Sequence, residues 1–313
     1  MTCEEPYMFI DAVNDYMRWF RINGKTWQRT KSVIDALILP EFGSIRIDAL
    51  TTQHIRRWMD RLVLTPARKK ISEYSPEDNF VLSEEELRKR KSSVNRYLNI
   101  LKAILNKAYQ DGMVSNDVAW KRIRPFRRAD APRMEYFELE EITRFVSVCR
   151  ADLRILVCSA LYTGCRYAEL GRMKVRDYNS ETGQLYVQPS KNDKARYVTL
   201  TSEGMEFFDN ICAKKNPDDL IFTKENGEPW KHSHQQRPFK KALKDAGIAK
   251  NASFHSLRHT HASQMAMQGI ELSIIAHQLG HSDSRMAERH YAHLAPSYVS
   301  ERIRSGFPTL GIN

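Results

Sequence analysis

The chain has 313 residues, enough for about two domains that each bury a core. Its 49 lysines and arginines outnumber its 38 aspartates and glutamates, and the net charge of +11 favours a polyanion such as nucleic acid as partner. Five widely spaced cysteines without a CxxC pair argue against a disulfide framework or a thiolate metal site, and no apolar run approaches the ~20 residues that span a bilayer. We therefore expect a cytoplasmic protein without a membrane segment.

The first part of the chain, residues 1–120, has the pattern of a small helical domain. A turn is expected around Gly43, and a helix begins near Thr51 or Thr52, where a hydroxyl can cap the free amides. Residues 64–91 are highly charged and are expected to form a surface excursion with a short helix from Ser83. Residues 92–112 then form an amphipathic helix with an apolar stripe and a polar stripe; the polar stripe contains Asn95, Asn99, Lys102 and Asn106.

A basic segment, residues 121–134, follows this helical part. It contains Lys121, Arg122, Arg124, Arg127, Arg128 and Arg133. Pro125 and Pro132 interrupt helical periodicity, so we interpret the segment as a linker to a second domain at 135–313, although a solvated basic run is the simpler alternative.

The second domain is expected to be helical with a small inserted sheet. Helical periodicity resumes at residue 136 and stops at Gly164, and two β-rich runs at 185–188 and 196–200 flank a polar turn, as in a hairpin. A further helix is capped by Thr201 or Ser202, and several short helices follow from about residue 238. The expected fold class is mainly α with a small antiparallel β-sheet (α+β).

Nine of the ten histidines lie between residues 232 and 293, so a metal site must be considered first. His255 and His259 have the i, i+4 spacing that places two imidazoles on one helix face, with His261 nearby. However, no HExxH motif is present and no acid lies in the same turn, so we expect no metal ion or other cofactor.

A cationic site explains the same region better. "TGCRYAEL" contains Arg166, "HSLRHTHAS" contains His255 and Arg258 on one helix face, "LGHS" contains His281, and "ERHYAHL" contains Tyr291. Each residue taken alone has a structural alternative: Arg166 pairs with Glu169, His255 is a satisfied core histidine, and Tyr291 is a packing residue.

Taken together and in this order, the motifs resemble those of the tyrosine recombinase (phage integrase) family over most of the chain. The resemblance implies a catalytic set of Arg166, His255, Arg258 and His281, with Tyr291 as nucleophile and a hairpin lysine at Lys191, for which Lys194 is the alternative. Two details differ from many members: Ser256 stands where aspartate is common, and Tyr291 follows His281 by ten positions, one more than usual.

These residue types suit phosphodiester chemistry. Two guanidinium groups match the non-bridging oxygens of a phosphate, His281 donates a further hydrogen bond, and His255 acts as base or orients the phosphate. Lys191 would protonate the departing 5′-hydroxyl. Because a phenol leaves more readily than an alcohol, the 3′-phosphotyrosyl link can be rejoined without ATP or metal.

The resemblance also implies the partners. The helical domain corresponds to a core-binding domain that closes around double-stranded DNA, which would place the protein on the nucleoid, and the expected phosphate contacts are Arg96, Lys102, Arg122, Arg124, Arg127 and Arg128. The tail after Tyr291 docks on a neighbouring protomer of a tetramer or folds on its own domain; its apolar residues are Val299, Ile303, Phe307 and Leu310. An accessory DNA-bending or directionality factor is a further candidate partner.

Three other functions compete with a recombinase: a type IB topoisomerase, a DNA-binding regulator without catalysis, and a metallohydrolase. The helical N-terminal domain and the tail favour a recombinase over a topoisomerase. The complete set of charged site residues argues against a regulator that has lost catalysis.

Overall fold

The computed structural model describes residues 6–65, 82–129, 136–189, 195–281, 283–294 and 304–308. The chain divides into two compact units, Met1–Ala131 and Pro132–Asn313, and each has its own hydrophobic core. Helices dominate both units, and the second contains one three-stranded antiparallel sheet, so the predicted fold class is confirmed. None of the helices in the described ranges has the length and hydrophobicity needed to cross a membrane.

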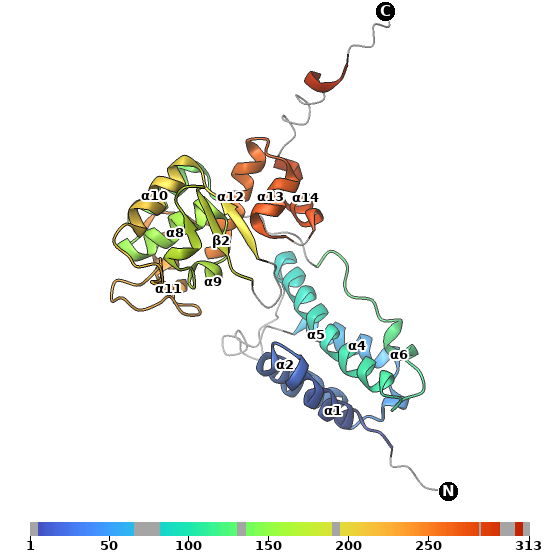
Figure 1. The fold of residues 1–313 in the computed structure, drawn as a ribbon. Coiled ribbons are helices and arrows are strands. Elements are labelled where there is room, and N and C mark those ends of the chain that lie inside the picture. The colour runs from blue at the N-terminus through green and yellow to red at the C-terminus, as the bar shows by residue number, and fades with distance from the viewer. Residues whose placement is uncertain are drawn as a thin grey trace, which may run out of the picture. The chain divides into compact units, whose positions relative to one another are not determined.

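The first unit is a bundle in which α5 packs against α1 and α4 (Figure 1). Its elements are α1 (Phe9–Asn23), α2 (Trp27–Val33), the π-helical η1 (Ile34–Ile38), α3 (Leu39–Phe42), the 3₁₀ turn η2 (Ile47–Ala49), α4 (Thr52–Leu64), α5 (Glu84–Gln110) and α6 (Val118–Lys121). The predicted cap of α4 is confirmed, because the Thr51 hydroxyl accepts a hydrogen bond from the His54 amide.

Helix α5 is longer than predicted. It begins after Ser83, as expected, and a capping box forms there: the Ser83 hydroxyl accepts from the Glu86 amide, and the Glu86 carboxylate accepts from the Ser83 amide. The prediction of a separate short helix was wrong, since one helix of 27 residues runs on to Gln110. No glycine or proline interrupts this stretch, so nothing in it ends the helix.

The polar stripe of α5 binds the basic segment that follows the bundle. Asn95 Nδ2 donates to the Phe126 carbonyl at 3.0 Å, and Asn95 Oδ1 accepts from the Phe126 amide at 2.8 Å. Lys102 Nζ donates to the Ile123 carbonyl at 2.7 Å, and Asn106 accepts from Trp120 Nε1 at 2.7 Å. Residues 120–126 therefore lie along α5 and are held there by hydrogen bonds. The amphipathic pattern alone predicts only that this polar stripe faces water.

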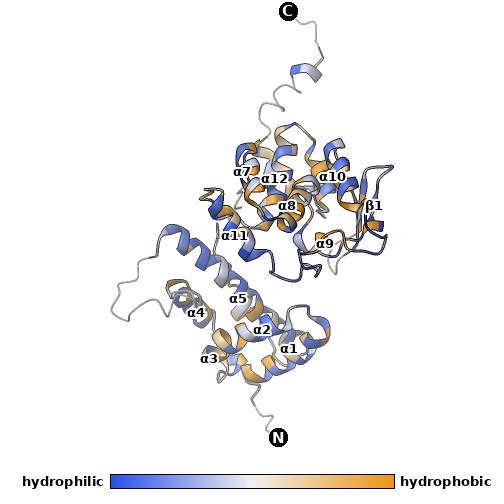
Figure 2. Ribbon diagram, turned by 90° about the vertical axis from the view of Figure 1, so that its left-hand side faces the viewer, coloured by the Kyte–Doolittle hydropathy of each residue, from blue (hydrophilic) through white to orange (hydrophobic). Residues whose placement is uncertain are grey.

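The second unit surrounds the central helix α8 (Figure 2). Its elements are α7 (Leu139–Val148), α8 (Ala151–Thr163), α9 (Tyr167–Leu170), η4 (Val175–Asp177), β1 (Tyr178–Asn179), β2 (Gln184–Val187), β3 (Arg196–Thr199), α10 (Ser202–Cys212), α11 (Gln236–Asp245), α12 (Phe254–Met267), α13 (Leu272–Leu279), α14 (Ser284–Tyr291) and η5 (Ala292–Leu294). Helix α12 packs on α8, and Leu156, Val157 and Ala160 of α8 are fully buried.

The predicted hairpin is confirmed as β2 and β3, with Leu185 opposite Val198. A third strand, β1, pairs with β2 and was not predicted, because two residues are too few to show an alternating pattern. Thr201 caps α10 by accepting from the Gly204 amide, as one of the two predicted caps. Helix α8 ends at Gly164 with φ of 64°, where a Cβ atom would lie 2.7 Å from His261 Cδ2. Glycine is thus required both for the left-handed backbone and for the close approach.

Replacing Asn95 with alanine should loosen the basic segment. The variant leaves the Phe126 amide and carbonyl without their partner, so we expect a loss of about 1–3 kcal/mol in the free energy of unfolding of the first unit. Amide hydrogen exchange over residues 121–129, together with denaturant unfolding, measures the effect. The exposed Asn99 on the same helix is the control, and equal losses in N95A and N99A would contradict this role.

Candidate active site

Five candidate residues occupy defined positions in the second unit. Arg166 is the N-cap residue of α9, His255 and Arg258 lie in the first turns of α12, His281 directly follows the glycine that ends α13, and Tyr291 is the last residue of α14. The hairpin lysines, Lys191 and Lys194, lie outside the described residues.

Arg258 links its own motif on α12 to the Arg166 motif and to the His281 motif through hydrogen bonds. Its side chain is buried, and it donates from Nη1 to the Gly164 carbonyl at 2.9 Å and from Nη2 to the Leu279 carbonyl at 2.6 Å. These carbonyls belong to residues two positions before Arg166 and two before His281. Burial, with the nearby charge of Arg166, lowers the pKa of Arg258 to about 10, which leaves the guanidinium charged at neutral pH.

Arg166 is held by Glu169, as the structural alternative for this residue predicted. Arg166 Nη1 donates to Glu169 Oε1 at 2.9 Å, and the Arg166 amide donates to Glu169 Oε2 at 2.8 Å. The Arg166 side chain remains one-third exposed, at 33%, whereas that of Glu169 is 3% exposed. The ion pair therefore orients an arginine that still reaches the surface, so pairing with Glu169 and binding a phosphate are compatible.

A second arginine, Arg196, also binds the Glu169 carboxylate. The sequence motifs did not identify this residue. Arg196 Nη1 and Nη2 donate to the two carboxylate oxygens at 3.0 and 2.8 Å, and its Nε donates to the Gln278 carbonyl at 3.1 Å. The available signal was alternation along β3, in which Arg196 and Val198 face inward. Gly280, with φ of 70°, passes so close that a Cβ atom would lie 2.7 Å from Arg196 Cδ.

The charge state of Glu169 reflects these partners. Burial raises the pKa of its carboxyl, but the hydrogen bonds and charge of Arg196, together with the Arg166 amide and guanidinium, outweigh burial and lower the pKa to about 2. Glu169 is thus a fixed anion between two cations.

His281 is a neutral imidazole in this environment. Burial lowers its pKa to about 4, with contributions from the positive charges of Arg258 and Arg166. Within the described part of the chain its buried Nδ1 has no hydrogen-bond partner. A neutral ring with an unused nitrogen can donate a hydrogen bond to an anion that enters the site.

Tyr291 is buried, and its hydroxyl contacts His259, whose spacing from His255 is that of a pair of metal ligands. The side chain is 2% exposed, and its Oη lies 2.9 Å from His259 Nδ1. Burial raises the pKa of Tyr291 to about 12, and the Arg258 charge opposes this rise. His255, exposed on the surface, places its ring edge-on to that of His259 with 4.8 Å between centroids.

The histidines of α12 point to different partners. His259 Nδ1 is used by Tyr291, and His261 Nδ1 lies 2.7 Å from the Leu161 carbonyl. Among the residues that the structure describes, no three His, Cys, Asp or Glu side chains form a group suited to a metal ion. Ser256, where the family often has aspartate, accepts from the Ser253 amide through its hydroxyl at 3.1 Å and so caps α12.

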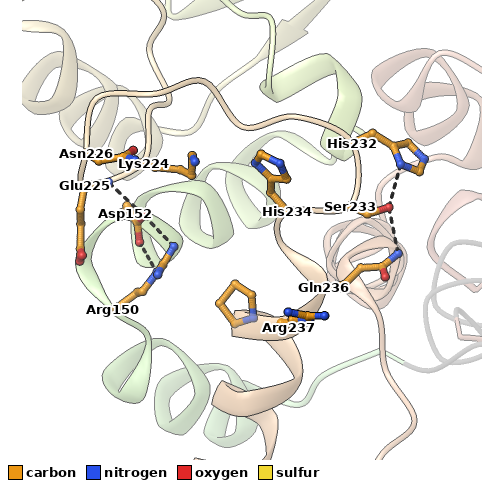
Figure 3. Close-up of a pocket in the computed structure, with 11 residues that line it drawn as sticks. Arg150, Asp152, Lys224, Glu225, Asn226, His232, Ser233, His234, Gln236 and Arg237 are labelled. Carbon is orange, nitrogen blue, oxygen red and sulfur yellow. Dashed lines mark hydrogen bonds and ion pairs between the residues drawn. The ribbon is translucent and has the colours of Figure 1, made fainter.

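A separate cavity of about 740 Å³ lies near the start of α8 (Figure 3). Its buried carboxylate, Asp152, accepts hydrogen bonds from Arg150 Nη2 at 2.9 Å and from the Glu225 amide at 3.2 Å. On the rim, the Ser233 hydroxyl contacts His232 Nδ1 at 2.8 Å. None of Arg166, His255, Arg258, His281 and Tyr291 lines this cavity, so it is not the site that the motifs predict.

Comparisons with known proteins bear on this fold and site. The sequence model of the phage integrase family matches residues 132–297, and that of the phage integrase N-terminal SAM-like domain matches residues 9–63. A tyrosine recombinase of Thermosipho africanus is 25% identical over 206 residues, which cover 62% of this chain and 69% of that protein.

Solved structures that share the fold include the following two. The integrase of the transposon Tn1549, in complex with a circular intermediate DNA, has a TM-score of 0.71 and 17% identity and covers 96% of this chain and 99% of its own. A lambda integrase tetramer bound to a Holliday junction has a TM-score of 0.70 and 19% identity and covers 92% of this chain and 78% of its own.

The shared fold and the matched sequence define a tyrosine recombinase, as predicted. More particularly, the chain belongs to the phage integrase family, whose sequence model covers more than half of its length.

Replacing Glu169 with glutamine should weaken the second unit in a pH-dependent manner. Because the folded pKa is about 2 and the ordinary value is 4.5, the ionised carboxylate stabilises the fold fully above pH 4.5 and loses this effect as the pH falls toward 2. We expect E169Q to lose about 3 kcal/mol at pH 7 and less at pH 3. Denaturant unfolding at both pH values measures this, with the exposed Glu206→Gln as control. A loss in E169Q that does not depend on pH would contradict it.

Proposed function

We propose that this protein cleaves and rejoins DNA strands at specific sites through a 3′-phosphotyrosyl intermediate on Tyr291, without ATP or metal. The observation that carries the proposal is the position of Arg258, whose guanidinium bonds to the backbone beside both the Arg166 motif and the His281 motif. This bonding pattern, together with the effect of the Arg258 charge on the pKa of Tyr291, supports one site built from two arginines, a neutral histidine and a tyrosine.

The attack on phosphorus creates negative charge that this site can meet. Arg166, with its partly exposed side chain, and the buried Arg258 supply fixed positive charge, and His281 supplies a neutral N–H donor. The bond from Tyr291 Oη to phosphorus forms while the bond from phosphorus to the 5′-oxygen breaks. The 5′-oxygen takes a proton from a general acid, for which Lys191 is our candidate and Lys194 the alternative.

DNA contacts outside the active site are proposed for the basic segment and α5. Arg96, Arg122, Arg124, Arg127 and Arg128 are exposed, as phosphate contacts must be. Lys102 differs from these arginines, because its ammonium group donates to the Ile123 carbonyl and burial lowers its pKa. Its proposed contribution is therefore partly to hold the basic segment in place.

Assembly on paired DNA sites is the second part of the proposal. The lambda integrase, which shares this fold, is described as a tetramer on a Holliday junction. We expect this chain to self-associate through its C-terminal tail, in which Phe307 is 65% exposed; Val299, Ile303 and Leu310 lie outside the described residues. Accessory DNA-bending or directionality factors remain candidate partners.

Replacing Tyr291 with phenylalanine should abolish covalent attachment to DNA, because the ring remains but the nucleophilic oxygen is lost. The substrate is a nicked duplex that carries the site recovered by binding selection from random sequences, and the adduct is measured by denaturing electrophoresis with chelator present. An adduct in Y291F, or its loss in the wild type on adding chelator, would contradict the proposal. Processive relaxation of any supercoiled plasmid would instead favour the topoisomerase alternative.

A change of the leaving group distinguishes the roles of the two hairpin lysines. A DNA with sulfur in place of the bridging 5′-oxygen releases a thiolate, which needs no proton because a thiol has a pKa of about 8.5. We expect K191A to be slower than wild type on ordinary DNA by a factor of roughly 10²–10⁴ and to recover on the sulfur-containing DNA. K194A is the matched comparison, and recovery by K194A but not K191A would assign the role to Lys194.

A further inference from the structure

The hydroxyl that must lose a proton already has a defined partner. Tyr291 Oη lies 2.9 Å from His259 Nδ1, a normal distance for a hydrogen bond. The tyrosine is 2% exposed, so bulk water has little access to this oxygen. A buried hydroxyl paired with an imidazole nitrogen has the geometry of a nucleophile and its base.

We propose that His259 positions the Tyr291 hydroxyl and accepts its proton as the oxygen attacks phosphorus. The inference rests on the proposed function of Tyr291 and assigns to His259 the role for which His255 was the candidate. His259 would therefore be a catalytic residue, because it contacts a reacting atom.

The helix geometry explains why His259, and not His255, meets the tyrosine. Both lie on one face of α12 at i and i+4, and their rings are in edge contact at 4.8 Å between centroids. His255 is at the exposed end of this pair, whereas His259 is one turn deeper, where α14 ends. The ring of His290 on α14 lies 6.0 Å from that of His259 and is tilted by 43° to it.

The charges around His259 keep its lone pair available. Burial lowers its pKa to about 4, and His255, His290, Arg258 and His281 all add to this effect. The ring is thus neutral at cellular pH, and when Nδ1 accepts from the tyrosine the proton of the ring is on Nε2. A phosphodiester bound at Arg166 and Arg258 brings negative charge that offsets the positive charge of Arg258, so DNA binding should make His259 a stronger base during the reaction.

The proton balance of the step is closed. Oη forms a bond to phosphorus and transfers its proton to Nδ1, while the 5′-oxygen leaves with a proton from the hairpin lysine. The imidazolium can then pass its Nε2 proton to water, and the exposed ring of His255 lies on the side toward solvent. The proton returns when the strand is rejoined.

The test uses three variants of the full-length protein in single-turnover adduct formation on the nicked duplex described above. His259→Leu removes the acceptor, His259→Asn keeps an oxygen close to the Nδ1 position, and His259→Gln places its oxygen nearer to the Nε2 position. We expect H259L, H259N and H259Q all to be slower than wild type by a factor of about 10² or more, because an amide oxygen can accept a hydrogen bond from Tyr291 but cannot take up its proton. Binding of the intact duplex should be unchanged, because His259 faces the tyrosine.

Two outcomes would overturn the proposal. If H259L forms the adduct as fast as wild type or faster, the hydrogen bond only restrains the tyrosine. If H259N stays within about tenfold of wild type while H259L is slow, the hydrogen bond positions the tyrosine and His259 does not accept its proton.

The DNA with a bridging 5′-sulfur distinguishes a role of His259 at the attacking oxygen from a role at the leaving group. It should restore K191A but not H259L, because the defect in H259L concerns the attacking oxygen. Restoration of H259L would place His259 at the leaving group and contradict the inference. Absence of any adduct with the wild-type protein would contradict the proposed function itself, whereas slow adduct formation confined to the His259 variants concerns this inference alone.

Discussion

The buried carboxylate of Glu169 is the interaction on which the cationic site depends. It accepts from Nη1 and Nη2 of Arg196 and from the side chain and amide of Arg166, so one anion connects α9, β3 and, through Arg196, the end of α13. Arg258 lies in the same neighbourhood, and without this anion the arginines would repel one another in a poorly solvated region. The same carboxylate therefore stabilises the fold and holds Arg166 in one orientation.

The candidate nucleophile, Tyr291, is held by packing and by a hydrogen bond rather than by an ion pair. Tyr291 belongs to a small cluster formed by α12, α13 and α14, separate from the main core of the second unit; its other buried members are Ala262, Ala266, Ile275, Ala276, Leu279 and Ala287. Four of these residues are alanines, which bury little apolar area. The position of α14 thus rests on modest packing and on the hydrogen bond to His259, and a rearrangement of this helix costs less free energy than one of α8.

The candidate site residues could be proposed from the sequence because their motifs are local. Arg166 follows a glycine turn, and the spacing of His255 and Arg258 places them on one helix face. The helix starts were predictable in the same way, because hydroxyl side chains cap them; these residues are Thr51, Ser83 and Thr201. Other features depend on partners distant in sequence. Arg196 was hidden in a strand pattern, and the polar stripe of α5 gave no sign that residues 120–126 would bind it. His259 had the spacing of a metal ligand, and only its contact with a residue 32 positions later suggests another role.

The sequence by itself determined the family and the fold class, and it indicated the candidate catalytic residues, because each depends on short patterns of charge, spacing and capping. Only the tertiary structure decided which groups touch. Burial lowers the pKa of His281 and of His259, whereas Arg196 and Arg166 keep the buried Glu169 ionised against the effect of burial. Burial and the identity of such neighbours depend on residues far apart in the chain, so the sequence pattern does not reveal them. The same limit explains why Tyr291 was predicted as the nucleophile while its hydrogen-bond partner was not.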